Sequence, residues 1–361
     1  MKKSAIPSTD LDDEAYQQHI LQDVSRTFAL TIPQLPEPLK RVVSNAYLLC
    51  RIADTIEDDK TMGAGVKRQL AERFIRVVAG NDSAGHFAGD LYPLLSTETT
   101  EYERDLVANT AAVIRITHSF NSRQRAALER CVAIMAEGMA RYQDAETLDG
   151  LDGLADLPDM GRYCYYVAGV VGEMLTELFC DYSGEIDQHR EVLMPLSVSF
   201  GQGLQMTNIL KDIWEDHHRG ACWLPRDIFM KYGVDIRRKK PGQMDKGFEQ
   251  GLGELIGVAR AHLANALRYT LFIPRHEKGL RRFCLWALGM AVLTLDKINK
   301  NRSFTHATEV KISRQCVKTT IITTSLFVTR DRMLNHLFNL TARRLPVVPI
   351  HEKLGGIHCG V

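Results

Sequence analysis

Apolar residues recur at intervals of three and four along most of the chain, which is the spacing of amphipathic helices. No segment shows the regular alternation of apolar and polar residues that is typical of a half-buried strand. Pro33, Pro36 and Pro38 interrupt the pattern early in the chain, because proline cannot continue a helix. The pattern predicts an all-α fold whose long helices surround an interior space. The expected helices cover residues 11–24, 37–59, 64–80, 99–118, 122–143, 159–182, 188–218, 249–271, 276–299 and 311–342.

Nothing along the chain marks a domain boundary: there is no Pro/Gly/Ser linker, no internal repeat and no shift in composition. We therefore expect one domain over residues 1–361, with its core at about 11–342 and a tail at 345–361. Hydrophobic residues make up 45% of the 361 residues, which is enough for a sizeable core. The longest apolar run, 283–295, is too short to span a bilayer, so we expect no transmembrane anchor.

Two acidic clusters stand out, one at residues 54–59 and one at 212–216. Each places two aspartates four residues apart, so on a helix both carboxylates point the same way. Like charges at this spacing repel by roughly 0.2–0.5 kcal/mol in solvent, and a cation between them is expected. Carboxylate and carboxamide oxygens without His or Cys favour Mg²⁺ over zinc. Because Mg²⁺ completes its coordination with water and phosphate, the expected ligand is a diphosphate.

Each acidic cluster belongs to a narrow polar line along a predicted helix. Helical steps backward from Asp58 meet Asp54, Arg51 and Tyr47, with apolar residues on the other sides. A solvent-exposed helix face is the usual explanation of a single acidic pair, but two such lines with apolar flanks favour the wall of a cavity. The second polar line consists of Gln205, Asn208, Asp212, Glu215, Asp216 and Arg219.

The predicted helix at 159–182 carries an apolar face with Tyr163 at its N-terminal end. Ala168 and Gly172 form an edge of small residues that would let another helix approach closely. The apolar face alone is compatible with ordinary core packing, but a buried tyrosine such as Tyr163 needs a hydrogen-bond partner. The residues that share this face are Tyr163, Val167, Val171, Met174 and Leu178.

Charge and cysteine usage limit the partners and the compartment. Lys and Arg number 45 against 44 Asp and Glu, a net charge of +1, so no nucleic-acid partner is expected. The eight cysteines form no CxxC pair, and Met-Lys-Lys at the start is not followed by an apolar segment. We expect reduced thiols, no signal peptide and a cytoplasmic location. If the substrate is lipidic, the protein must meet it from the aqueous side, through peripheral contact with the membrane.

Four blocks of sequence occur in the order and spacing of a known family. They are Ser25-Arg26-Thr27-Phe28, Tyr47 to Asp59, Tyr163 to Gly172, and Gln205 to Asp216. On these blocks the chain resembles the squalene and phytoene synthase family, and within it the soluble squalene synthases of bacterial type. The resemblance implies a single-domain isoprenoid-synthase bundle around a hydrophobic channel. It also implies an Mg²⁺-dependent farnesyltransferase that joins two farnesyl diphosphates head to head, through presqualene diphosphate, with NADPH reduction to squalene.

The resemblance also implies roles for individual residues, with Glu215 as a further candidate at the metal. Metal binding would fall to Asp54, Glu57, Asp58, Asn208, Asp212 and Asp216. Substrate binding would fall to Ser25, Arg26, Thr27, Phe28, Tyr47, Gln205, Val167, Val171 and Arg219. The catalytic residues would be Tyr163, Arg51, Asp54, Asp58, Asp212 and Asp216.

A fifth block, residues 310–315, is similar to a basic segment that squalene synthases use near NADPH. It makes Lys311 and Arg314 the expected cofactor-binding residues, although Ser313 interrupts the family's basic run and an ordinary helix start is the alternative. A second departure is Ala221, which stands where the family often has another basic residue after Arg219. The missing cation bears on how strongly the adjoining flap closes over phosphate.

Other functions stay open at this point. Within the family, a dehydrosqualene or phytoene synthase and a presqualene diphosphate synthase would use no NADPH. A non-catalytic relative is expected to lose metal carboxylates, whereas both acidic clusters are intact here. A terpene cyclase has comparable acidic motifs but is not favoured by the block at Tyr163. The sequence does not determine prenyl chain length, the oligomeric state or the role of the tail.

Overall fold

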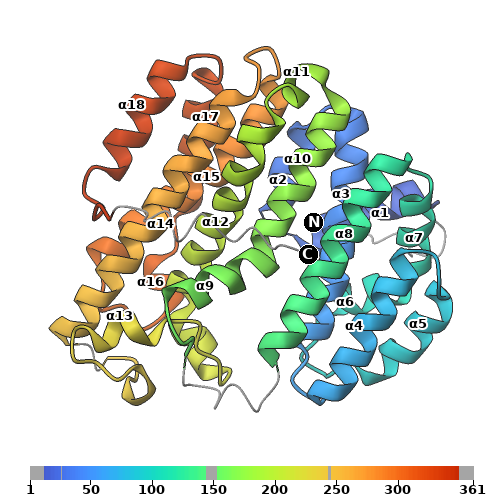
Figure 1. Ribbon diagram of the computed structural model, residues 1–361, viewed down its shortest axis with the longest axis horizontal. Coiled ribbons are helices and arrows are strands. Elements are labelled where there is room, and N and C mark those ends of the chain that lie inside the picture. The colour runs from blue at the N-terminus through green and yellow to red at the C-terminus, as the bar shows by residue number, and fades with distance from the viewer. Residues whose placement is uncertain (1–11, 26, 144–152, 243–244, 349–361) are drawn as a thin grey trace, which may run out of the picture. The chain divides into compact units, whose positions relative to one another are not determined.

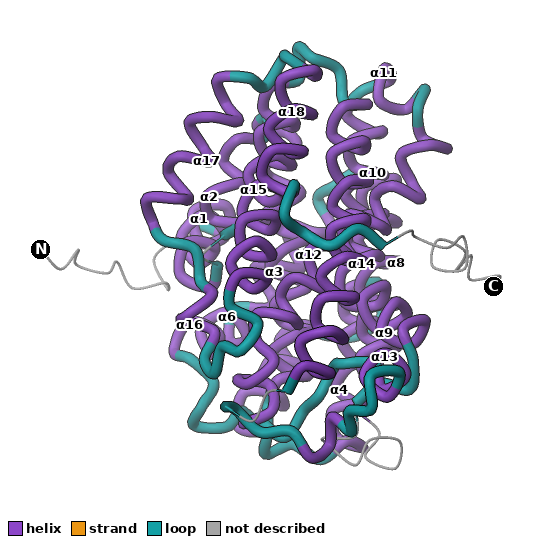
Figure 2. Tube along the Cα trace, turned by 90° about the vertical axis from the view of Figure 1, so that its left-hand side faces the viewer, coloured by secondary structure: helices purple, strands orange, loops and turns teal. Residues whose placement is uncertain are grey.

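The structure is a computed structural model that describes residues 12–25, 27–143, 153–242 and 245–348. Within these ranges the regular structure is helical, and the only β-type pairing is an isolated bridge between Leu154 and Pro225 (Figures 1 and 2). The expected all-α class is confirmed. Most of the predicted tail lies outside the described residues.

The chain divides into two compact units. The first comprises residues 1–143 and 177–182, and the second comprises residues 144–176 and 183–361. The single domain expected from the sequence therefore stays a prediction.

In the first unit, α3 and α4 pack against α8. The apolar side of α3 is buried through Leu48, Leu49 and Ile52, and Phe74 of α4 stacks on Phe87 of α5 with 5.3 Å between ring centroids. This packing holds the C-terminal half of α3 and its acidic residues in place. The elements are α1 (Asp13–Val24), α2 (Phe28–Thr31), η2 (Ile32–Gln34), α3 (Glu37–Asp58), α4 (Ala64–Val78), α5 (Ala84–Leu91), η3 (Tyr92–Leu94), α6 (Glu101–Ala108), α7 (Thr110–His118) and α8 (Ser122–Gln143).

In the second unit, α12 packs along α14, and α15 contacts both (Figure 1). Across the interface between α12 and α14, Ser199 Oγ lies 2.8 Å from Nδ1 of His262, and a Cβ atom added to Gly203 would lie 3.0 Å from Leu263. The elements are α9 (Leu157–Cys164), the π-helical η4 (Tyr165–Gly169), α10 (Val170–Tyr182, whose residues 177–182 belong to the first unit), α11 (Gly184–Asp187), α12 (Arg190–His218), α13 (Arg226–Met230), η5 (Ile236–Arg238), α14 (Lys246–Phe272), α15 (Lys278–Lys300), α16 (Ala307–Val310), α17 (Arg314–Leu326) and α18 (Asp331–Ala342).

The small-residue edge predicted on the tyrosine-bearing helix is confirmed. A Cβ atom added to Gly172 would lie 2.3 Å from the carbonyl oxygen of Ser197, and one added to Gly201 would lie 2.2 Å from that of Ala168. Both distances are far inside van der Waals contact, so any side chain at either glycine would push η4 and α10 away from α12.

Two predicted helices, at 99–118 and 311–342, are wrong in their continuity. The segment 99–118 forms two helices because the backbone leaves helical geometry at Asn109, whose side chain donates to the carbonyl of Asp105. The segment 159–182 is helical throughout, as predicted, and contains the wider π turn η4. The segment 311–342 forms α17 and α18, with a break at 327–330. Short helices that the periodicity missed include α5, which begins at the capping hydroxyl of Ser83.

A buried arginine accounts for the break between α17 and α18. The side chain of Arg281 is completely buried, and its Nη1 donates to the Val328 carbonyl at 2.7 Å. That carbonyl would be occupied by the helix itself if α17 continued. Nη2 of Arg281 pairs with Asp331 Oδ1 at 2.6 Å, at the first residue of α18. Arg281 therefore defines both the end of one helix and the start of the next.

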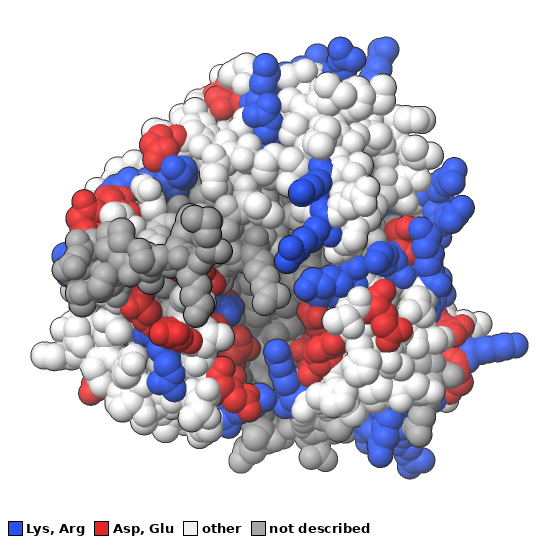
Figure 3. All heavy atoms as spheres, turned by 180° about the vertical axis from the view of Figure 1, so that it is seen from behind, with Lys and Arg blue, Asp and Glu red and all other residues white. Residues whose placement is uncertain are grey.

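No helix in the described ranges is both long and apolar enough to cross a membrane. The face shown in Figure 3 carries acidic and basic side chains together, and the whole chain has a net charge of +1. The cysteines that the structure describes are all free thiols, and five of them are buried.

Candidate active site

The first acidic motif occupies the last turn of α3, where Asp54 lies beside a cation. Nη1 of Arg51 is 3.8 Å from Asp54 Oδ2, and Nη2 pairs with the carboxylate of Glu103. Glu103 also closes a capping box with Thr100 at the start of α6, which holds its carboxylate in place. Glu103 is not among the residues predicted from the sequence, although Thr100-x-x-Glu103 is a recognisable capping signal.

The carboxyl group of Asp54 is strongly perturbed by its surroundings. Burial, together with the nearby charge of Asp58, raises the pKa of Asp54 to about 7. Arg51 opposes this shift but does not cancel it. Burial would lower the pKa of Arg51 itself, but Asp54 and Glu103 raise it above the ordinary value. A divalent cation would remove the repulsion between the two aspartates, which is what a metal ligand pair requires.

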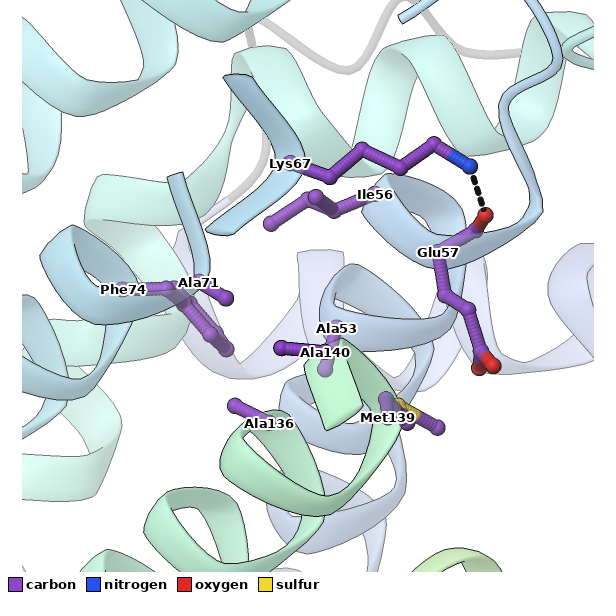
Figure 4. Close-up of a pocket in the computed structure, with 9 residues that line it drawn as sticks. All are labelled: Ala53, Ile56, Glu57, Lys67, Ala71, Phe74, Ala136, Met139 and Ala140. Carbon is purple, nitrogen blue, oxygen red and sulfur yellow. Dashed lines mark hydrogen bonds between the residues drawn. The ribbon is translucent and has the colours of Figure 1, made fainter. Parts of the chain in front are cut away.

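Glu57 borders a pocket between α3, α4 and α8 (Figure 4). Lys67 reaches over this pocket from α4 and donates a hydrogen bond to the backbone carbonyl of Glu57. The floor is apolar, formed by small and medium side chains such as Ala53, Ala136 and Met139. Lys67 is a second cation at the first motif, and no pattern in the sequence connects it with Glu57.

Asp59 differs from its acidic neighbours because it serves the fold. Its Oδ1 accepts hydrogen bonds from the backbone amides of Thr61 and Met62, and its Oδ2 accepts one from the Ser96 amide at 2.6 Å. Burial opposes ionisation, but these hydrogen bonds lower the pKa of Asp59 to about 2. This carboxylate is already saturated with donors, which supports its absence from the expected metal ligands.

The block that begins at Ser25 packs next to Tyr47. Ser25 Oγ accepts from the amide of Phe28 at 3.0 Å, so it starts the short helix α2. The rings of Phe28 and Tyr47 lie 5.3 Å apart, and the Tyr47 hydroxyl donates to the Val24 carbonyl at 2.9 Å. Burial raises the pKa of Tyr47. Arg26 lies outside the described residues, and Thr27 is exposed.

The second acidic motif lies at the end of α12, where the helix is bent. Asp212 has φ −101° and ψ 15°, so the helix expected over 188–218 is present but kinked at this residue. Its carboxylate lies 3.1 Å from Nζ of Lys211. Burial raises the pKa of Asp212, although the charge of Lys211 lowers it. Asp54 and Asp212 thus both have a pKa raised by burial and a neighbouring cation that opposes the shift. The bend changes the direction of the residues that follow, including Asp216.

Glu215 uses one of its carboxylate oxygens for the fold. Oε1 accepts a hydrogen bond from the backbone amide of Ala307 at 2.8 Å, whereas Oε2 is buried without a hydrogen-bond partner. Of the other predicted residues on α12, Gln205 is half-buried and Asn208 is exposed. Arg219 ends the helix, and its charge favours the ionised form of Asp212.

Tyr163 is buried at the end of α9 and stacks on Trp223. The two rings are 4.1 Å apart and nearly parallel, at 7°. Trp223 belongs to the segment after α12, and no sequence pattern pointed to it. The face predicted to join Tyr163 to Val167 and Val171 is interrupted by η4, and both valines are half-buried. Their place at the substrate stays a prediction.

The expected cofactor segment precedes α17. Lys311 and Arg314 are both exposed, and Ser313 caps the helix through a hydrogen bond from the Cys316 amide. Lys297 Nζ donates to the carbonyl of Lys311 at 2.7 Å. Exposed cations such as Lys311 and Arg314, next to a helix N-terminus, are the kind of groups that bind phosphates of a dinucleotide.

Within the described ranges, no three His, Cys, Asp or Glu side chains come together as a preformed metal site would. The donors nevertheless fit Mg²⁺, because each motif offers hard carboxylate oxygens of raised pKa and Glu215 has an unpaired buried oxygen. Asp54 and Asp212 belong to different units.

Comparisons with known proteins agree with this description. The family model for squalene/phytoene synthase matches residues 21–316. The squalene synthase of Schizosaccharomyces pombe is 28% identical over 363 aligned positions, covering 98% of this chain and 75% of that protein. The squalene synthase of Solanum lycopersicum is 32% identical over 281 positions, 76% of this chain and 62% of the relative. A solved complex of TcSQS with the ligand E5700 has a TM-score of 0.71 at 22% identity, and the match covers 95% of each chain.

Proposed function

The chain belongs to the squalene/phytoene synthase family, and from that premise we propose that it is a squalene synthase acting on two molecules of farnesyl diphosphate. The observation that carries the proposal is that each acidic motif has its own cation, Arg51 beside Asp54 and Lys211 beside Asp212. Such a pairing suits a leaving group whose negative charge grows as a carbon–oxygen bond breaks. A surface that only binds a cation would not need the basic residues.

In the proposed mechanism, Asp54, Asp58, Asp212 and Asp216 would hold Mg²⁺ for the diphosphate, with Glu57 and Asn208 completing the set of ligands. The metal, when bound, supplies positive charge that stabilises the departing diphosphate. Arg51 supports the same charge directly, and Glu103 holds its guanidinium in position. Ionisation leaves the electron pair of the broken bond on the diphosphate and an allylic cation on the farnesyl chain.

The cation then reacts with the double bond of the second farnesyl group. Loss of a proton, to the released diphosphate or to the Tyr163 oxygen, closes the cyclopropane of presqualene diphosphate. Trp223 stacks on Tyr163, and the aromatic faces of Trp223 and Phe28 can stabilise a carbocation by roughly 0.5–2 kcal/mol. Burial of Tyr163 keeps water, a competing nucleophile, away from that position.

Reduction to squalene is the last step of the proposed reaction and requires NADPH. NADPH, when bound, would supply the hydride that quenches the carbocation left after the second ionisation and rearrangement. Lys311 and Arg314 are the residues we propose to hold its phosphates, because both are exposed at the start of α17. A dehydrosqualene synthase or a presqualene diphosphate synthase would need neither residue.

Incubation of the protein with farnesyl diphosphate and Mg²⁺, with and without NADPH, tests the function, with products identified by mass. Squalene formed only with NADPH is the expected result. Dehydrosqualene or presqualene diphosphate in both incubations would contradict the use of NADPH. A preference for geranylgeranyl diphosphate would point to a phytoene synthase instead.

The change Tyr163→Phe tests the role of the phenol. We expect product formation to fall by about 10²-fold or to be diverted, because a proton acceptor or donor is removed from the reaction. The phenylalanine ring can still stack on Trp223, so the dissociation constant of farnesyl diphosphate should stay within about twofold. Tyr166→Phe, three residues along, is the control and should react like the wild type. Equal rates and products for the two variants would exclude Tyr163 from the chemistry.

We also propose a peripheral contact with an anionic membrane through α17. Ile322 and Leu326 lie one turn apart and are 67% and 70% exposed, on the same line as the basic Lys318. Leu326→Glu is expected to weaken co-sedimentation with anionic vesicles about tenfold. Met230→Glu, at a residue that is 68% exposed on α13, should leave it unchanged. Equal binding by both variants would contradict the proposal. The cytoplasmic location stays a prediction.

A further inference from the structure

Two consecutive residues of the second acidic motif are hydrogen-bonded to the segment that leads to α17. Nε1 of Trp214 donates to the Phe304 carbonyl at 2.7 Å, and Glu215 Oε1 accepts from the Ala307 amide at 2.8 Å. Trp214 is buried and packs against Phe248 with 6.0 Å between ring centroids. The segment is therefore attached to α12 at a buried residue, Trp214, and at its neighbour Glu215.

Glu215 makes the stronger of these two contacts. A hydrogen bond to a carboxylate is charge-assisted and roughly twice as strong as one between neutral groups. Ala307 is the first residue of α16, where a backbone amide has no partner within the helix itself. The second oxygen of Glu215 is buried without a partner in this structure, so the side chain is held by the Ala307 amide rather than by solvent.

From Ala307 the chain has little freedom before it reaches the basic residues. Val310 at the end of α16 is completely buried, and Lys297 Nζ donates to the Lys311 carbonyl at 2.7 Å. Upstream, Glu309 Oε1 accepts from the amides of Thr305 and His306 at 2.9 and 3.0 Å. The segment 304–311 is thus held to α12 by Trp214 and Glu215, and to α15 at its other end by Lys297.

We propose that Glu215 is a positioning residue that sets the place of the basic segment 311–314 with respect to the diphosphate-binding end of α12. This inference rests on the proposed function, since it assigns to that segment the binding of NADPH. The contact would matter for the second half of the reaction, in which hydride must reach the cyclopropyl intermediate. Formation of presqualene diphosphate does not require the segment to be in place.

Ala307→Pro tests the contact without altering the carboxylate. Proline lacks the amide hydrogen that Glu215 binds, but it is well tolerated at the first position of a helix. The preceding residue, His306, is extended at φ −142° and ψ 141°, which is the conformation that a following proline requires. Ala307→Ser retains the amide and is the matched control. Lys297→Met is a second variant, which releases the segment at its other end.

Three measurements on the full-length protein decide the proposal. For Ala307→Pro and Lys297→Met we expect the ratio of presqualene diphosphate to squalene to rise at least threefold, with consumption of farnesyl diphosphate within twofold of the wild type. The dissociation constant of NADPH, from nucleotide fluorescence without substrate, should rise at least threefold. Backbone amides of 304–311 should exchange faster with deuterium. Ala307→Ser should resemble the wild type in all three.

The results also separate this proposal from the function on which it rests. A wild-type protein that makes squalene with NADPH, together with unchanged product ratio and NADPH affinity in folded Ala307→Pro and Lys297→Met, would overturn the role of Glu215 alone. A wild-type protein that neither binds NADPH nor responds to it would contradict the proposed function and the inference together.

Discussion

Replacing Asp54 by asparagine is expected to abolish turnover and at the same time stabilise the metal-free protein at pH 8. Activity should fall by at least about 10²–10³-fold, because a ligand of the metal that stabilises the departing diphosphate loses its charge. The gain in stability follows from the raised pKa of the group. Asparagine has nearly the shape of aspartate but no charge to bury.

The contribution of Asp54 to the free energy of unfolding depends on pH. The pKa of Asp54 rises from 3.8, the ordinary value, to about 7 in the folded protein. Between these values the folded state binds more protons than the unfolded state, so the free energy of unfolding decreases as pH rises from about 4 to about 7. The side chain is 31% exposed, which screens its charge, and we expect a loss of about 1 kcal/mol above pH 7.

Urea denaturation of the wild type and Asp54→Asn at pH 5 and pH 8, with a chelator present, measures this effect. The two proteins should differ by about 1 kcal/mol more at pH 8 than at pH 5. Asp59→Asn is the control from the same motif and should be destabilised instead, because the lowered pKa of Asp59 reflects stabilising hydrogen bonds. Normal turnover by Asp54→Asn would remove it from the metal site, and an unchanged pH profile would contradict the effect of burial.

Arg281→Met is expected to lower the free energy of unfolding by about 3–5 kcal/mol, because it breaks a buried charge pair and leaves its partners unsatisfied. Arg281 donates to the carbonyl of Val328 at 2.7 Å and to Asp331 Oδ1 at 2.6 Å, with longer contacts to the carbonyls of Thr270 and Leu271. Methionine fills a similar volume but donates no hydrogen bond. The change should affect α17 and α18, whose ends the arginine defines.

The neighbouring Arg275 provides a matched control for this change. It binds the other oxygen of Asp331 at 2.6 Å, but its side chain is 68% exposed, and exposed pairs contribute about 1 kcal/mol or less. Arg275→Met should therefore shift the urea midpoint much less than Arg281→Met. Equal shifts for the two variants would show that burial of Arg281 does not decide its contribution.

The sequence by itself determined the helical class and the candidate motifs of this protein. Both are local: periodicity reports which side of a helix is buried, and the spacing of aspartates reports which carboxylates share a side. The close approach at Gly172 could be predicted for the same reason, since a missing side chain is visible in the sequence. The break at 327–330 could not be predicted from local sequence, because it depends on Arg281, a residue on another helix.

Only the tertiary structure decided the electrostatics and the partners of the site. The raised pKa of Asp54 depends on burial by other helices, and the position of Arg51 depends on Glu103, 52 residues away. Trp223 meets Tyr163, and Glu215 meets Ala307 across 92 residues, through contacts that no local pattern encodes. Such pairs form only when packing of the whole chain offsets the entropy lost in closing long loops, so they depend on all the residues that fill the core.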